Sequence, residues 1–495
     1  MPLASVFKNA AIKADSVAII DDTGSYTFAQ LARMTAGLAG FLAATTTRQH
    51  VGILLPPGAA FSAAFHACLM AQKSAVPINY LLGPRETAHI LNDAELDTVI
   101  TVGPLAARLT SPDPASSAQT SPALNIIDVM TLPAKLQAAP PVIPPMPNLP
   151  ADFTATILYT SGTSGLPKGV PLTIGNLQAS VTAAETHTKI DSSCAFLGVV
   201  PLFHSTGMMV TLLMPTHLGA KVVYQSRFNP TAVVTAIREH KLSVITMVPS
   251  MYGAILRLKN ATADDFSTVK YCVSGGEPLP PTIRAAVEQR FGLKLLEGYG
   301  LTETIGPLAF NVPWANRPGS VGKLLPGVTV RVVDDNGQQL PQAATGEIQV
   351  SGPIVLSRYH NSPTAALTAD GFFPTGDLGH LDSEGFLHIT GRKKDLIIVG
   401  GEKVYPREVE DLIATNPAVA EVAVIGRKDD LRGEAVIAFV SPREGATITP
   451  EAIRAHCRDS GLVNWKTPKD VYILPELPKS PTGKVLKRQL AEQAN

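Results

Sequence analysis

Apolar and amphipathic segments alternate over about the first 130 residues of the chain. VGILL at 51–55 is a short apolar run typical of a buried strand, and GAAFSAAFHACLMAQ at 58–72 has helical character. SAVPIN, the amphipathic PRETAHILNDAE and DTVITV repeat this order further along. Alternation of this kind predicts parallel strands connected by helices that cover both faces of a sheet.

Changes of pattern divide the rest of the chain. Residues 110–123 and 139–150 are rich in Ser, Ala and Pro, which predicts surface connections between two sub-lobes of similar architecture. Strand–helix alternation resumes over 152–310. From about residue 317 to 390, short strand patterns with Gly and Asp-Asn-Gly turns predict a smaller β unit.

The pattern changes again near GRKKD at 391–395. Strand-like AVAEVAVIG, EAVIAFVS and VYILPEL alternate with the amphipathic PREVEDLIA and PEAIRAHCRD. The chain is therefore predicted to be an α/β protein with a large N-terminal domain over 1–390, made of two βαβ-type sub-lobes and the β unit. A connection at 391–395 leads to a small α+β domain over 396–495, of ordinary domain size.

Composition excludes several classes of protein. A chain of 495 residues is too long for one simple core. Lys and Arg number 41, as do Asp and Glu, so the basic excess usual in nucleic-acid-binding proteins is missing. The four cysteines, at 68, 194, 272 and 457, form no CxxC pair. Neither a zinc site nor a disulfide framework is indicated, which fits a reducing cytoplasm.

Nothing in the apolar pattern predicts a membrane span or a leader peptide. The most membrane-like stretch, at 51–72, is interrupted by Pro56, Pro57, Ser62 and His66. The first residues lack the apolar region of a signal peptide, and the last three are not a peroxisomal tripeptide. We expect a cytoplasmic protein.

The loop YTSGTSGLPKG at 159–169 is the first candidate for chemistry. Its glycines, including Gly169, allow positive φ and a close approach of the backbone to an anion, and its hydroxyls and N–H groups can form an anion nest. It is not a Walker A loop, because Pro167 precedes the lysine and Gly169 follows it. On spacing alone, a polar surface turn explains the loop equally well. The candidate phosphate-binding residues are Thr160, Ser161, Gly162, Thr163, Ser164, Gly165 and Lys168.

Six further motifs follow this loop in order. They are PLFHSTG at 201–207, SGGEPLP at 274–280, GYGLTET at 298–304, FPTGD at 373–377, GRKKDLIIVGGEKVYPREVE at 391–410 and LPKSPTGK at 477–484. Together with the loop they resemble the signature motifs of the adenylate-forming (AMP-binding) superfamily, over nearly the whole chain. This family includes acyl-CoA synthetases, peptide-synthetase adenylation domains and beetle luciferases. The resemblance implies that a carboxylate and ATP form an acyl-adenylate and pyrophosphate, with Mg²⁺, and that a thiol, most simply that of CoA, then displaces AMP.

The resemblance also implies the nucleotide contacts. Tyr299 would pack on the adenine, Thr302 would touch the α-phosphate, and Glu303 would bind Mg²⁺, which prefers hard oxygen ligands. Asp377 and Arg392 would contact the ribose hydroxyls. The wall beside the adenine would come from Gly275, Gly276, Glu277 and Pro278, and Gly298 is a further candidate for nucleotide binding.

The C-terminal motifs imply two working positions of the small domain. Lys484 would enter the site for adenylation and stabilise negative charge on the carboxylate and α-phosphate. Lys394 would be the hinge. After the small domain rotates, Gly400, Gly401, Glu402 and Lys403 would line the tunnel for the thiol.

The segment 201–209 bears on the acid substrate. His204 falls where the family places a gate between the acyl pocket and the thiol tunnel. The segment has no carboxylate to hold an amino acid's ammonium, and Thr206 stands where oxalate- and malonate-specific members carry a second His. Met208, Met209 and Met251 give an apolar pocket if they line it, although core packing explains them at least as well. We expect a fatty or aryl carboxylate, of a chain length that the sequence does not indicate.

Three alternatives stay open. The protein could be a stand-alone adenylation enzyme that loads a carrier protein, or a CoA ligase for short dicarboxylates of the oxalate or malonate type. It could also be a catalytically silent nucleotide-binding protein, although the joint presence of Lys168, Glu303, Asp377, Arg392 and Lys484 argues against that.

Overall fold

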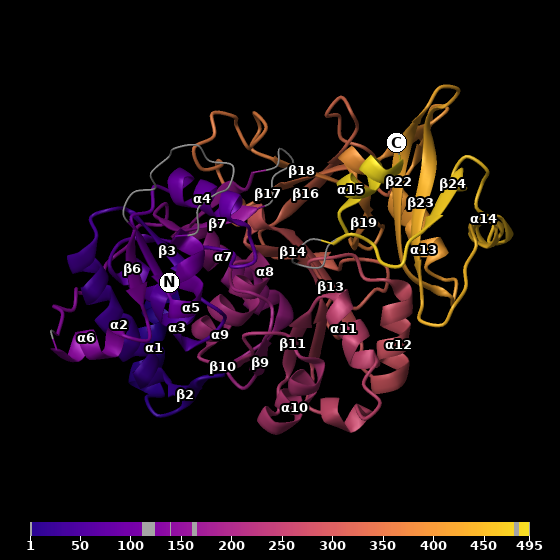
Figure 1. Ribbon diagram of the computed structural model, residues 1–495. Helices are drawn as coiled ribbons and strands as arrows, with labels where there is room; N and C mark the ends of the chain where they lie inside the picture. Colours follow the sequence, from indigo (N-terminus) through magenta and orange to yellow (C-terminus); the bar gives the residue numbers. More distant parts are fainter. Residues whose placement is uncertain (1, 111–123, 139, 161–165, 480–484, 495) are drawn as a thin grey trace.

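The computed structural model describes residues 2–110, 124–138, 140–160, 166–479 and 485–494. Within these residues the chain forms sheets of six, nine, four and five strands. Figure 1 shows the C-terminal part, in yellow, beside the orange β unit and far from the indigo N-terminal helices. The predicted class, α/β with a large N-terminal and a small C-terminal domain, is confirmed.

The first sub-lobe contains the six-stranded sheet, of order β6-β5-β3-β4-β7-β8. Its pairs are parallel except for the antiparallel hairpin of β7 and β8. In α3 every residue except Ala60 is buried, as a helix that is apolar on all sides requires. The apolar stretch at 51–72 is therefore a strand and a core helix. The strands are β3 (His50–Leu54), β4 (Ser74–Pro77), β5 (Thr98–Thr101), β6 (Asn125–Asp128), β7 (Thr154–Thr160) and β8 (Lys168–Thr173); the helices are α1 (Pro2–Ile12), α2 (Phe28–Thr45), α3 (Ala59–Met70), α4 (Pro84–Asp93), α5 (Gly103–Thr110) and α6 (Leu132–Ala138).

The second sub-lobe contains the nine-stranded sheet, of order β15-β14-β13-β12-β11-β9-β10-β1-β2. Strands β13, β12, β11, β9 and β10 run parallel, and the chain's first strand, β1, joins them beside β10. The strands are β1 (Val17–Asp21), β2 (Gly24–Thr27), β9 (Ala195–Gly198), β10 (Lys221–Tyr224), β11 (Val244–Met247), β12 (Tyr271–Ser274), β13 (Leu295–Leu301), β14 (Gly306–Phe310) and β15 (Lys323–Leu324). The helices are α7 (Ile174–Thr188), α8 (Ser205–Gly207), α9 (Met214–Leu218), α10 (Pro230–His240), α11 (Pro249–Leu256) and α12 (Pro281–Phe291), with a π-helix η1 (Met208–Leu213) and 3₁₀ turns η2 (Ala263–Phe266) and η3 (Thr302–Thr304).

The β unit and the C-terminal part follow. The β unit is an antiparallel sheet of β16 (Thr329–Val333), β17 (Gly346–Ser351), β18 (Phe373–Leu381) and β19 (Leu387–Arg392). After the 3₁₀ turn η4 (Lys393–Asp395) the chain enters a different sheet and separate apolar clusters, the pattern of an independent core. Its elements are β20 (Ile397–Val399), β21 (Glu402–Val404), α13 (Pro406–Ile413), β22 (Val419–Asp429), β23 (Gly433–Pro442), α14 (Pro450–Asp459), β24 (Asp470–Ile473) and α15 (Lys487–Ala494).

No helix among these described elements combines the length and the apolar character needed to cross a bilayer.

Candidate active site

Three of the predicted motifs meet at one edge of the nine-stranded sheet. Strands β9, β11 and β12 are parallel neighbours, and PLFHSTG follows the carboxyl end of β9 while SGGEPLP follows that of β12. Strand β13 lies beside β12 and itself carries Gly298 and Tyr299 of GYGLTET. The carboxyl ends of parallel strands are the usual place for ligands in open α/β sheets. The topology therefore builds one candidate site from segments about 100 residues apart.

The predicted ribose and adenine residues form a contact group. The Tyr299 hydroxyl donates to Oδ2 of Asp377 over 2.5 Å, and Nε of Arg392 lies 3.4 Å from Oδ1. Asp377 and Arg392 are also opposite each other in the register of β18 and β19. Burial and the neighbouring carboxylate raise the pKa of the Tyr299 phenol well above its usual value, so it stays a hydrogen-bond donor.

The Asp377 carboxylate is fixed from more than one side. Only 5% of the residue is exposed, and its backbone N–H donates to the Thr375 hydroxyl over 3.0 Å. A buried carboxylate is costly unless it has partners, which Tyr299 and Arg392 supply here. The carboxylate is thereby held in place before any ligand binds.

A second group joins the phosphate loop to the predicted magnesium residue. Lys168, at the start of β8, pairs with Thr160 across the hairpin, and its Nζ lies 5.8 Å from the centre of the Tyr359 ring. The Tyr359 hydroxyl donates to Oε1 of Glu303 over 2.9 Å. Burial, and then the charge of Glu303, raise the pKa of the Tyr359 phenol. The ends of the loop, Glu303 and a tyrosine outside every predicted motif therefore lie together.

The prediction that Gly169 supplies a positive φ is wrong. Gly169 lies within strand β8, and it is not among the glycines with positive φ. A Cβ atom there would lie 2.9 Å from Cβ of His360 and 3.1 Å from Cγ2 of Ile157. Glycine is required by close packing between β8 and the segment at His360, whose N–H donates to the Gly169 carbonyl over 2.9 Å.

The wall motif SGGEPLP forms the bend between β12 and α12. Gly276 has φ +82°, a conformation that favours glycine. A Cβ added there would meet only Cγ1 of Val248, at 3.7 Å, so the conformation and not crowding selects the residue. Gly276 and Pro278 are exposed and Glu277 is half-buried, while Thr302 and Glu303 of η3 are also half-buried.

His204 stands at the start of α8, within a short series of aromatic rings. Its ring lies 4.7 Å from that of Phe203, which makes an edge-to-face contact of 5.0 Å with Tyr80 from the six-stranded sub-lobe. Met208 and Met209 are almost fully buried in the core, where Sδ of Met209 lies 3.6 Å from the Ser180 hydroxyl. These two methionines therefore pack as core residues.

Those predicted small-domain residues that the structure describes are exposed. Lys394 is exposed in η4, and Gly400 and Gly401 form an exposed turn between β20 and β21, which begins with the exposed Glu402. The Gly400 N–H donates to the Arg432 carbonyl over 2.7 Å. Ser161, Gly162, Thr163, Ser164, Gly165 and Lys484 lie outside the described residues.

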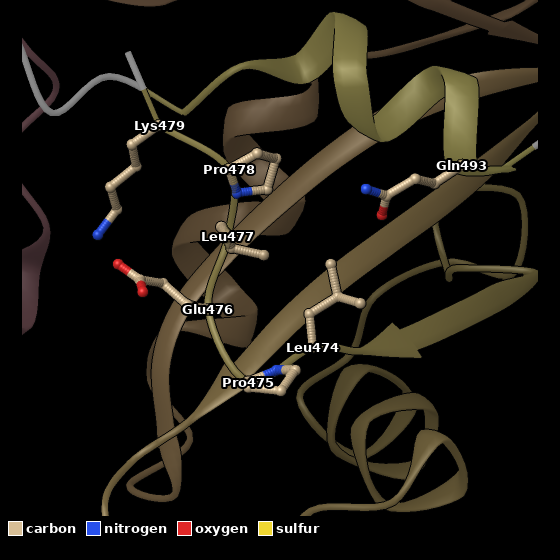
Figure 2. A pocket seen from close by; sticks show the side chains of 7 residues that line it. All are labelled: Leu474, Pro475, Glu476, Leu477, Pro478, Lys479 and Gln493. Atoms are coloured by element: carbon tan, nitrogen blue, oxygen red, sulfur yellow. The ribbon is translucent and has the colours of Figure 1, made fainter. Parts of the chain in front are cut away.

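Two pockets on the described residues lie elsewhere. One, of about 640 Å³, runs along the outer face of α7 towards Pro326 and Pro353. The other, of about 470 Å³, lies on the small domain, where Gln493 of α15 faces the segment 474–479 (Figure 2). Neither is lined by a residue predicted for the nucleotide.

Sequence reasoning missed Tyr359 and Asp335. Tyr359 lies in the segment before β18, outside the motifs, and Asp335 lies in the turn after β16, where its ion pair with Lys403 joins the two domains. Neither has a local signal, because each is identified by a partner distant in the sequence.

Comparisons with known proteins agree with this geometry. The family model "AMP-binding enzyme" matches residues 6–360, and "AMP-binding enzyme C-terminal domain" matches 408–484. The chain is 34% identical to the sulfoacetate–CoA ligase of Cupriavidus necator, over 90% of this chain and 88% of that one. It is 34% identical to a feruloyl-CoA synthase of an Amycolatopsis species, over 94% and 93%.

Solved structures give the same result. ATP-bound MatB from Rhodopseudomonas palustris superposes with a TM-score of 0.91 at 28% identity, over 99% of this chain and 98% of that one. The o-succinylbenzoate CoA synthetase of Bacillus subtilis, in complex with its acyl-adenylate, superposes with a TM-score of 0.86 at 29% identity, over 98% and 97%. With both family models matched in chain order, the chain belongs to the AMP-binding enzyme family.

Proposed function

We propose that the protein is an AMP-forming acid–thiol ligase that converts a carboxylic acid, ATP and CoA to an acyl-CoA, AMP and pyrophosphate. The observation that carries the proposal is the pair of contact groups at the sheet edge, Tyr299–Asp377–Arg392 and Lys168–Tyr359–Glu303. Their residue types suit a ribose and a magnesium-bound phosphate chain respectively. The relatives named above are themselves CoA ligases.

The first half-reaction forms the acyl-adenylate. A carboxylate oxygen attacks the α-phosphorus, and the bond to the bridging oxygen breaks, so that pyrophosphate leaves with the electron pair. The protein mainly has to align the two reactants and neutralise charge. Asp377 and Arg392 would hold the ribose, while Lys168 and the predicted Lys484 would supply positive charge around the phosphates and the attacking carboxylate.

Magnesium fits the residues present. Mg²⁺ is usually held by one or two carboxylates together with substrate phosphates, and it neutralises phosphate charge when bound. Glu303 offers such a carboxylate, and its Oε1 is already held by the Tyr359 hydroxyl. Among the described residues there is no group of three or more His, Cys, Asp or Glu that could form a cage. A single carboxylate working with ATP phosphates is the matching arrangement.

The second half-reaction transfers the acyl group. The thiol loses its proton, sulfur attacks the acyl carbon, and AMP leaves with the electron pair. We propose that the small domain, residues 396–495, rotates about 391–395 between the two steps. Lys394 lies in the short turn η4 between the sheets of the two domains, a position that can absorb a backbone change.

We propose a fatty or aryl acid as the substrate. The absence of a carboxylate from 201–209 supports this, as does similarity to feruloyl-CoA synthase and to long-chain fatty-acid and indoleacetate CoA ligases. The burial of Met208 and Met209 in the core removes part of the argument for a methionine-lined pocket. Similarity to ligases of sulfoacetate and oxalate keeps a small dianionic acid as the second candidate.

The test is a panel of acids assayed first for pyrophosphate release and then for thioester. The panel contains fatty acids of rising length, aryl acids, amino acids, oxalate, malonate and sulfoacetate. Specificity should rise by about fourfold per added CH₂, from about 0.8 kcal/mol each, until the pocket is full. A strong preference for a dianion or an amino acid would contradict the pocket assignment but not the adenylation chemistry.

The identity of the thiol acceptor and the presence of activity are tested by separate measurements. Offering CoA and a phosphopantetheinyl carrier protein in parallel distinguishes the proposed ligase from an enzyme that loads a carrier. Absence of pyrophosphate release with every acid would favour a silent nucleotide-binding protein and overturn the proposal.

A further inference from the structure

One carboxylate of the large domain contacts a lysine in η4 and a second lysine beyond it. Oδ1 of Asp335 lies 3.5 Å from Nζ of Lys393, which is in η4. Oδ2 of the same carboxylate lies 3.4 Å from Nζ of Lys403, which is in β21 of the small domain. Asp335 therefore joins the large domain to the turn and to the domain beyond it.

Asp335 is available for this contact because the neighbouring Asp334 makes the hydrogen bonds of the turn between β16 and β17. In the connection between β16 and β17, Oδ1 of Asp334 accepts hydrogen bonds from the N–H groups of Asn336 and Gln338, each over 2.9 Å. The side chain of Asp335 takes no part in those bonds and projects towards the two lysines. Removing its charge should leave the hairpin intact.

Lys403 belongs to the segment that the second half-reaction needs. It directly follows Gly400, Gly401 and Glu402, the turn predicted to line the thiol tunnel. In the arrangement seen here, Asp335 of the β unit holds this segment by its last residue. Lys393 is held more firmly, because it also lies 3.0 Å from Oε2 of Glu347 on β17.

We propose that Asp335 is a positioning residue, which holds the small domain in the present arrangement and must release Lys403 before the segment 400–403 can serve the thiol. The proposal rests on the proposed two-step function for its consequence, but the contact itself can be tested without any turnover.

The ion pairs of Asp335 favour the present arrangement of the domains but are too weak to prevent the change to the other one. Asp335 and Lys403 are 70% and 54% exposed at their side chains, and exposed ion pairs are individually weak. Loss of both Asp335 contacts should change the ratio of the two arrangements by about two- to tenfold. The hydrogen bond from Arg407 of α13 to the Ile389 carbonyl, 3.2 Å long, also joins the two domains and should persist.

Salt and pH should act differently on this contact. The hydrogen bond and charge of Lys403, and then Lys393, lower the pKa of the Asp335 carboxyl. The stabilisation is therefore present above the unfolded pKa of about 3.9 and is lost as pH falls through the lower folded value. The charged groups facing Asp335 are Lys393 and Lys403, with Glu347 behind Lys393. Between about pH 6 and 8 the contact should not respond to pH, whereas salt should weaken it.

The direct experiment measures the distance between the domains. All four native cysteines are buried, so Asn260→Cys in the large domain and Ser460→Cys in the small domain offer exposed sites for a pair of fluorophores. Asp335→Asn should lower the ratio of the present arrangement to the other one by about two- to tenfold. Raising the salt from about 0.02 to 0.5 M should do the same to the parent protein and add little in Asp335→Asn.

A matched variant and a double variant complete the test. Glu451→Gln removes an equally exposed carboxylate from an ion pair inside α14, with Arg454, and should leave the distances unchanged. Lys403→Gln should reproduce most of the effect of Asp335→Asn and add little to it. In half-reaction assays, Asp335→Asn should raise thioester formation relative to adenylation by a similar factor. Unchanged distances in Asp335→Asn would overturn the proposal, whereas shifted distances without acyl-CoA formation would count against the proposed function alone.

Discussion

The two parts of the candidate site are held by different kinds of contact. In the large domain, Asp377 is 5% exposed and is fixed by Tyr299 and Arg392. In the small domain, Glu402 and Lys403 are exposed, and Lys403 is held by an ion pair whose partner is itself largely exposed. Buried, partnered groups hold one geometry, whereas exposed ion pairs exchange easily with water.

This difference fits the two proposed roles: the large-domain groups bind the nucleotide, and the small-domain residues change position between the half-reactions. The groups predicted to bind the nucleotide are held in place by their partners, so changes there should affect nucleotide affinity and stability. If the small-domain residues occupy two positions in turn, as proposed, changes there should affect one half-reaction while the fold persists.

The largest effect is expected from Lys484→Ala. If this lysine stabilises the developing charge only during adenylation, acyl-adenylate formation should slow by about 10²- to 10³-fold. Capture of a supplied acyl-adenylate by CoA should stay nearly unchanged. Rapid-quench assays of each half-reaction measure this, and equal losses in both would refute the assignment.

Acid should lower the stability of the large domain through a histidine in its core. Burial lowers the pKa of His66 in α3 to about 4, and the hydrogen bond of its Nδ1 with the Ser62 carbonyl offsets only part of that effect. The unfolded chain, with a pKa near 6.5, binds the proton first, so stability should fall as pH drops from about 6.5 to 4. His66 alone accounts for about 3 kcal/mol of that loss.

Denaturant titrations at several pH values measure the His66 effect. His66→Leu keeps the buried volume similar and should flatten this part of the stability profile. An unchanged pH dependence in His66→Leu would show that other groups cause the acid sensitivity.

Replacement of the hinge residue should separate the half-reactions. Proline restricts φ, so Lys394→Pro should hinder one arrangement and lower thioester formation by about tenfold or more while adenylation continues. Lys394→Ala removes the same side chain but keeps a free backbone, and is the matched control. Full thioester turnover in Lys394→Pro would place the hinge elsewhere.

The smallest effect should come from Tyr299→Phe, which keeps the ring and removes only the hydroxyl. Asp377 loses one donor but keeps Arg392, so we expect about 0.5–1.5 kcal/mol of destabilisation and a several-fold weaker ATP affinity. Calorimetry and thermal melting with and without ATP measure both. Unaltered ATP affinity would mean that the contact does not orient Asp377 for the nucleotide.

The sequence predicted the element order well because its signals are local. The strand at 51–55, the core helix after it and the change of fold near 391–395 follow from apolar periodicity and turn residues within short windows. The motif residues at the carboxyl edge were also found in the sequence. Gly169 was misjudged because the close approach of His360, far along the chain, determines that position.

The sequence by itself determined the family, the chemistry and the succession of strands and helices, because each depends on short stretches of contiguous residues. Only the tertiary structure decided that β1 joins the second sheet beside β10, that Tyr359 holds Glu303, and that Asp335 holds Lys403. The last two contacts span 56 and 68 residues. Such contacts depend on how whole sheets and domains pack, because no short window of sequence contains both partners.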